Sequence, residues 1–205
     1  MNTMMVKNIK FEKECSVTGT LDDFAKKLDY PHEDQTRLLR GINHKIASLA
    51  CTKRYAMYCS LFNSLFPSSE GRRYDARKGN TRELAYVDHG FIGNASDSLI
   101  NRMHAERNIV ANLKMKLSYN SEVMSFEVED NGVGMDYNFE PLIFFTKIES
   151  FKKISDLPYI GKFGEHMFLS REKIEQCDGS IHFENKGPNQ GARFWYEIPA
   201  EAILK

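Results

Sequence analysis

The feature that most constrains this chain is a strand-like run that ends in an acid followed by two glycines. Residues 123–128 alternate as a β-strand does, and Asp130, Gly132 and Gly134 follow directly. The strand would aim the carboxylate of Asp130, and the glycines would let a ligand come close to the backbone. A carboxylate at a strand end can accept a hydrogen bond from the exocyclic amine of adenine. The segment therefore predicts a nucleotide pocket, with an ordinary Asn-Gly turn as the alternative.

Composition narrows the class of protein. The 205 residues are 41% hydrophobic and carry a formal net charge of zero, which suits one large domain, or one domain with an N-terminal extension. Without a net positive charge, the chain as a whole does not attract nucleic acid or an anionic membrane. No apolar run approaches the roughly 20 residues that span a bilayer, and the first residues lack the apolar stretch of a signal peptide. We therefore expect a cytoplasmic protein with no membrane span and no nucleic-acid partner.

The order of the expected elements predicts the fold class. We expect a strand within residues 4–18, helices at 20–29 and 33–66 and a loop at 67–80, then a helix at 81–106, a hairpin over 109–129, a helix at 165–177 and two closing strands at 180–183 and 192–198. Thr20 and Thr81 are the expected helix caps. This order is typical of an α+β sandwich, in which helices cover a mixed, mostly antiparallel sheet. The loop at 67–80 marks the expected boundary between an N-terminal segment, 1–80, and a second unit, 81–205.

Several short motifs in the second half occur in a recognisable order. Residues 130–135 match a glycine box, residues 139–147 resemble a phenylalanine box, and residues 168–184 with 191–199 resemble a closing helix and hairpin. Together they resemble the ATP-binding domain shared by sensor histidine kinases, DNA gyrase B, the MutL repair proteins and the ninety-kilodalton heat-shock chaperone, and they are closest to the histidine kinases. The resemblance implies a Bergerat-type ATP-binding fold, with ATP and Mg²⁺ as ligands.

In this family an asparagine on a helix holds magnesium, and an acid one turn earlier polarises water or a substrate group. Two positions of this chain resemble that asparagine. Asn101 has Asp97 four residues before it, so the resemblance implies Asn101 as the metal ligand and Asp97 as a catalytic residue. Asn94 lies in a segment that resembles the chaperone's asparagine box, but Gly90 stands one turn before it. Both asparagines stay open as nucleotide-binding residues.

The second glycine box departs from the family pattern. Residues 161–166 contain only two glycines, where the kinases have several that wrap backbone N–H groups around phosphates. Lys162 and Gly164 are the residues that we expect in this phosphate lid. Ala192 stands where a threonine is common on the last hairpin. The adenine end of the expected pocket is thus better preserved than its phosphate end.

His44 is the candidate phosphoryl acceptor. Residues 43–49 resemble the phosphoacceptor box of one class of histidine kinases, and an exposed imidazole can accept a phosphoryl group at nitrogen. The second long helix of a kinase dimerisation hairpin is not found, so a surface histidine is the alternative. His89, His104, His166 and His182 are interpreted as surface or core residues.

These observations lead to one main hypothesis of function and two rivals. The main one is an ATP-binding kinase or ATPase that acts in signalling through phosphoryl transfer or hydrolysis, with a protein partner in its pathway and a homodimer left open. The second is a non-catalytic histidine-phosphotransfer or partner-docking module that keeps the fold and binds ATP weakly or not at all. The third is an ATP-driven conformational switch.

Overall fold

Each pair of neighbouring strands that the structure describes in the sheet runs antiparallel. The computed structural model describes residues 9–26, 28, 35–67, 74–134 and 165–204. The strands are β1 (Phe11–Gly19), β2 (Ala111–Tyr119), β3 (Val123–Asp130), β4 (Ser180–Asn185) and β5 (Ala192–Pro199). Their order in the sheet is β1-β2-β3-β5-β4. A mixed, mostly antiparallel sheet was expected, and the four described pairings are all antiparallel.

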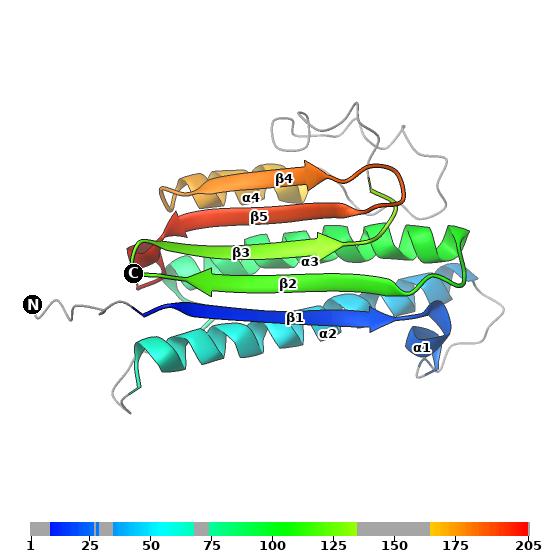
Figure 1. The fold of residues 1–205 in the computed structure, drawn as a ribbon, viewed down its shortest axis with the longest axis horizontal. Helices are drawn as coiled ribbons and strands as arrows, with labels where there is room; N and C mark the ends of the chain where they lie inside the picture. The colour runs from blue at the N-terminus through cyan, green and yellow to red at the C-terminus, as the bar shows by residue number, and fades with distance from the viewer. Residues whose placement is uncertain (1–8, 27, 29–34, 68–73, 135–164, 205) are drawn as a thin grey trace, which may run out of the picture.

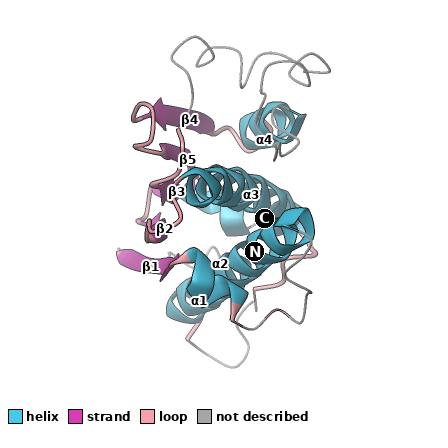
Figure 2. Ribbon diagram, turned by 90° about the vertical axis from the view of Figure 1, so that its right-hand side faces the viewer, coloured by secondary structure: helices cyan, strands magenta, loops and turns pink. Residues whose placement is uncertain are grey.

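Helices cover one face of this sheet. They are α1 (Leu21–Ala25), α2 (Gln35–Leu65), α3 (Gly79–Ala105) and α4 (Glu165–Glu175), and a 3₁₀ helix (Ala200–Leu204) follows β5. Figure 1 shows the strands in front of the helices, and Figure 2 shows the two layers from the side. The two-layer α+β sandwich is confirmed. Within the described residues, no helix is both long and apolar enough to cross a membrane.

The alternation along β2 determines which face of the sheet is covered. Leu113, Met115 and Leu117 are fully buried beneath the helices. Lys114 and Lys116 point to the open face, where they pair with Glu14 and Glu12 of β1 at 3.2 Å and 3.1 Å. One face is therefore wet and the other buried, as the alternation predicted.

The two expected helix caps had different outcomes. Thr20 caps α1, and its side chain accepts a hydrogen bond from the N–H of Asp23. Thr81 is not a cap, because α3 begins at Gly79 and Lys78 occupies the N-cap position. The Thr81 hydroxyl instead contacts the carbonyls of Asp75 and Lys78. Thr81 therefore lies within the first turn of α3, where its hydroxyl donates to carbonyls that precede the helix.

The N-terminal segment shares the sheet and the core with the rest of the chain. β1 pairs with β2 along its whole length, and α2 packs against α3. Ile42 and Ile46 of α2 are fully buried in the same hydrophobic cluster as β2 and β3. A separate dimerisation or phosphotransfer role for residues 1–80 stays a prediction.

A buried polar network fixes α2 against α3 and β5. Arg54 of α2 donates to Asp88 of α3 at 2.5 Å and to the hydroxyl of Tyr74 at 2.9 Å. Tyr196 of β5 donates to the other carboxylate oxygen of Asp88 at 2.9 Å. Burial raises the pKa of Asp88, while the charge of Arg54 opposes that shift. Because breaking a buried pair leaves an uncompensated charge, these contacts restrict how α2 can move on α3.

Candidate functional site

Asp130 lies at the end of β3 with its side chain turned into the protein, and the residue is only 2% exposed. Its Oδ1 accepts hydrogen bonds from the hydroxyl of Ser98 at 2.9 Å and from the N–H of Gly132 at 2.8 Å. Its Oδ2 is buried and makes no hydrogen bond of normal geometry within the described chain. A buried carboxylate oxygen without a donor is costly, so this atom points to a missing ligand donor.

Burial raises the pKa of Asp130 to about 7. The N–H of Gly132, the hydroxyl of Ser98 and the N–H of Ala192 each lower it, as does the charge of Lys186, but burial outweighs them. The carboxyl group is therefore held near the point where its charge changes at neutral pH. A donor supplied by a ligand would favour the charged form.

The two glycines after Asp130 allow close contacts between backbones. A Cβ on Gly132 would lie 2.2 Å from the hydroxyl oxygen of Ser98, so a side chain there collides with α3. Gly134 has a φ of +69°, and a Cβ on it would lie 2.4 Å from the carbonyl oxygen of Gly187 in the β4–β5 turn. These positions require glycine for packing.

The two candidate asparagines flank Ser98 on α3. Asn94 lies one turn before Ser98 and Asn101 three residues after it, so all three share a helix face. Asn94 is 6% exposed and Asn101 is 7% exposed. The structure thus brings Asn94 and Asn101 to the two sides of the Ser98–Asp130 contact. Sequence reasoning missed Ser98, although its position between the two amides on one helix face was a usable signal.

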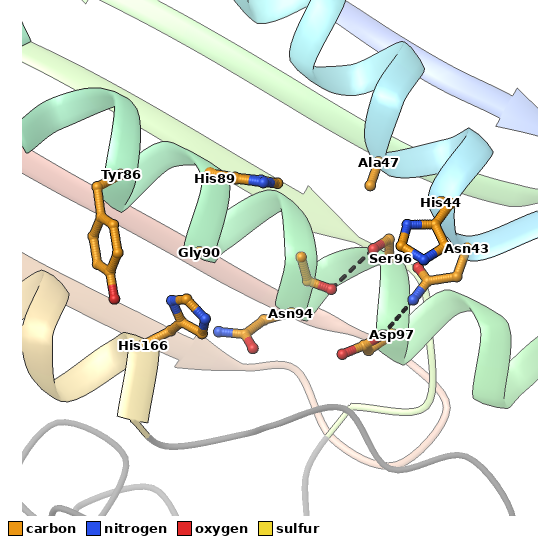
Figure 3. A pocket seen from close by; sticks show the side chains of 11 residues that line it. Asn43, His44, Ala47, Tyr86, His89, Gly90, Asn94, Ser96, Asp97 and His166 are labelled. Carbon is orange, nitrogen blue, oxygen red and sulfur yellow. Dashed lines mark hydrogen bonds between the residues drawn. The ribbon is translucent and has the colours of Figure 1, made fainter. Parts of the chain in front are cut away.

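Asp97 and His44 border a pocket of about 270 Å³ between α2, α3 and the start of α4. Asn43 of α2 donates to Asp97 Oδ1 at 2.6 Å, and the exposed His44 lies beside this bond (Figure 3). Burial raises the pKa of Asp97 to about 6, while the hydrogen bond from Asn43 and the charge of His44 lower it. Nothing local in the sequence indicates this role of Asn43, because its partner is 54 residues away.

The same pocket contains residues that the sequence placed elsewhere. His89 and His166, interpreted as surface or core histidines, are both exposed and both line it, together with Tyr86, Gly90 and Asn94. The rings of Tyr86 and His166 lie 5.4 Å apart between their centroids. Figure 3 shows His166 entering from α4 towards Asn94 on α3. No sequence pattern could indicate that these helices meet here.

Part of the expected site lies outside the described residues. Lys162 and Gly164 belong to this part, as does the phenylalanine box at 139–147. Their roles stay predictions.

Comparisons with known proteins concern the fold. The sequence matches no known protein-family profile and no curated protein. Among solved structures, the chain is similar to the mycobacterial sensor histidine kinase MprB, with 13% identity and a TM-score of 0.46 over 59% of this chain and 74% of that one. At this identity the likeness says nothing of ligand or activity.

Two further solved structures have the same kind of similarity. The catalytic domain of histidine kinase ThkA shares 18% identity, with a TM-score of 0.44 over 60% of this chain and 69% of that one. The histidine kinase domain of the blue-light activated kinase EL346 from Erythrobacter litoralis shares 12% identity, with a TM-score of 0.43 over 82% of this chain and 75% of that one. The chain is thus similar to several histidine kinase domains in solved structures.

The raised pKa of Asp130 predicts a specific pH dependence of stability. The folded protein keeps this proton up to about pH 7, whereas an unfolded aspartate loses it near pH 4. The contribution of Asp130 to the free energy of unfolding is therefore fully present below about pH 4 and is lost as the pH rises to about 7, by at most roughly 4 kcal/mol. In Asp130→Asn the amide oxygen can keep both acceptor bonds, so we expect this fall to disappear.

Denaturant unfolding of the nucleotide-free protein between pH 4 and pH 8 measures the effect. Asp178→Asn, in the turn after α4, is the matched control and keeps the wild-type slope. Parallel profiles for wild type and Asp130→Asn would show that Asp130 ionises normally in the folded protein.

Proposed function

We propose that this protein binds ATP, with Asp130 as the residue that selects adenine. The observation that carries the proposal is the buried Oδ2 of Asp130, which makes no hydrogen bond of normal geometry within the described chain, although the N–H of Ala192 lies close enough to lower the pKa of the group. The exocyclic amine of adenine would supply a donor, while guanine presents a carbonyl oxygen there and would leave the carboxylate unsatisfied. Gly132 and Gly134 form the floor beside it. The match of residues 130–135 to a glycine box supports the same assignment.

Magnesium fits the donors of this site. The carbonyl oxygen of a buried amide, with water and phosphate oxygens, is a suitable ligand set for Mg²⁺. Asn94 and Asn101 are seven residues apart, about 10 Å along the helix, which is too far for both to bind one ion. The pocket with His44 and Asp97 adjoins Asn94, and this favours Asn94 at the phosphate end. The ion, when bound, would neutralise phosphate charge.

The proposed reaction is phosphoryl transfer or hydrolysis in a signalling pathway. Asp97 lines the same pocket as Asn94. Either oxygen of its carboxyl group would hold or accept a proton. His44 lines the same pocket with an exposed ring and would accept the phosphoryl group at a ring nitrogen. A protein partner would then receive the group from His44. These roles are consistent with the geometry of α2 and α3.

A second candidate function is a phosphotransfer or docking module that does not use ATP. One observation favours it: Asn43 donates to Asp97, so this carboxylate is already engaged. In that case the fold would serve to present His44 to a partner, and the sparse glycines at 161–166 would have no phosphate to hold.

The direct test of the main proposal is nucleotide binding measured by calorimetry with Mg²⁺. Wild type should bind ATP with micromolar affinity and GTP at least tenfold more weakly. Asp130→Asn presents a donor where adenine needs an acceptor, so its ATP affinity should fall at least tenfold, roughly 1.4 kcal/mol or more. Glu122→Gln, in the β2–β3 turn, is the control and should bind as wild type does. Wild type that binds no ATP would refute the proposal.

The magnesium assignment has its own test. Asn94→Ala should remove most of the increase in ATP affinity that Mg²⁺ produces, measured as the ratio of the ATP affinities with Mg²⁺ and in EDTA. Asn101→Ala is the matched variant on the same face and should keep the magnesium effect. The reverse pattern would assign the ion to Asn101 instead.

The acceptor role of His44 is tested with ATP labelled at the terminal phosphate. Wild type should acquire label that is lost in acid and kept in base, as a phosphorylated imidazole requires, and His44→Gln should acquire none. His182→Gln, on strand β4, should label as wild type does. Persistent label in His44→Gln would exclude His44, and unlabelled wild type would exclude phosphoryl transfer from ATP.

A further inference from the structure

The end of the pocket near Asn94 contains a second polar atom without a partner. The Nδ2 atom of Asn94 is buried, and it has no acceptor within the described residues. Figure 3 shows this amide on the side of the pocket that faces His166. An unsatisfied buried N–H donor calls for an acceptor. A carboxylate or phosphate oxygen is the acceptor that a ligand would bring.

His166 comes to this point from the first turn of α4. Its ring packs beside that of Tyr86, with 5.4 Å between the centroids. A Cβ on Gly90 would lie 3.7 Å from the Cβ of His166 and 3.4 Å from the hydroxyl oxygen of Ser170, which are ordinary contact distances, so the start of α4 lies directly against this part of α3. His166 is the second residue of this 11-residue helix, and the N–H groups of a first helical turn have no acceptor within the helix.

The charges around the pocket decide what kind of anion it can accept. Its described lining residues include no lysine or arginine, and His166, His89 and His44 are its basic groups. Asp97 lies in the same lining beside His44 and disfavours an anion there. The half of the pocket formed by Asn94 and His166 is therefore the half suited to a phosphate group, since it combines an amide donor, an imidazole and a helix N-terminus.

We propose that Asn94 and His166 form the subsite for the terminal phosphate of the nucleotide, with the His166 imidazole as a donor. This inference rests on the proposed binding of ATP at Asp130. The distance along α3 between the two proposed subsites agrees with this inference. Gly90 lies next to His166, and Ser98, which contacts Asp130, comes eight residues later, about 12 Å along the helix. The side chain of His166 then supplies a phosphate contact that the few glycines of the second glycine box do not provide. It also determines the preference for ATP over ADP.

The test compares ATP and ADP on the full chain by calorimetry with Mg²⁺. Wild type should bind ATP about tenfold more tightly than ADP, because a hydrogen bond to a charged group contributes roughly that factor. His166→Gln should lose this preference while its ADP affinity stays within twofold, and His182→Gln should keep it. Equal loss of ATP and ADP affinity, or no loss of either, would overturn the proposal.

A second measurement separates this subsite from the adenine site. Tripolyphosphate, which has no base, should shift the imidazole proton resonance of His166 in NMR spectra of both wild type and Asp130→Asn. If ATP does not bind but tripolyphosphate shifts His166, the adenine assignment is wrong and the phosphate subsite stands. If tripolyphosphate leaves the His166 resonance unmoved, the subsite is wrong, whatever happens at Asp130.

Discussion

The close approach of three backbone segments around Asp130 is the constraint on which the site depends. A Cβ on Gly191 would lie 1.9 Å from the carbonyl oxygen of Asp130, and one on Gly132 would lie 2.4 Å from the backbone carbon of Ser98. The N–H of Val133 donates to Ser98, and the N–H of Asn189 donates to Val133. The end of β3 is thus held between α3 and the β4–β5 turn, and only glycine allows that contact.

This packing explains how one loop can serve both structure and binding. Ser98 and the N–H of Gly132 satisfy one oxygen of Asp130 and fix the direction of the carboxylate. Under the function proposed above, the other oxygen would accept the donor of the base. A rigid acceptor already in place reduces the entropy that binding has to overcome, so such specificity would arise from the fold itself and not from a flexible side chain.

The sequence predicted the order of the elements well, whereas the division of the candidate site into an adenine end and a phosphate end stays a prediction. Alternation in residues 123–128 and the glycines that follow are local signals, and local signals mark strands and turns. The roles of Asn43 and His166 depend on α2 and α4 meeting α3, so they come from contacts between residues far apart in the chain. The Thr81 cap was wrong because the helix begins earlier, at Gly79, after an N-cap residue whose side chain makes no capping hydrogen bond.

The attachment of α2 bears on how His44 could work. α2 is tied to α3 twice, by Asn43 to Asp97 and by Arg54 to Asp88. These two points are 11 residues apart, about 16 Å along α2, so the helix cannot turn about either contact alone. His44 therefore keeps its place at the pocket edge while both contacts hold. Under the function proposed above, an acceptor on a freely hinged helix could reach towards a phosphate, but a histidine fixed in this way would receive a phosphoryl group only from a nucleotide whose terminal phosphate extends to it. The distance between His44 and the proposed phosphate subsite, set by α3, would then decide between transfer to His44 and hydrolysis.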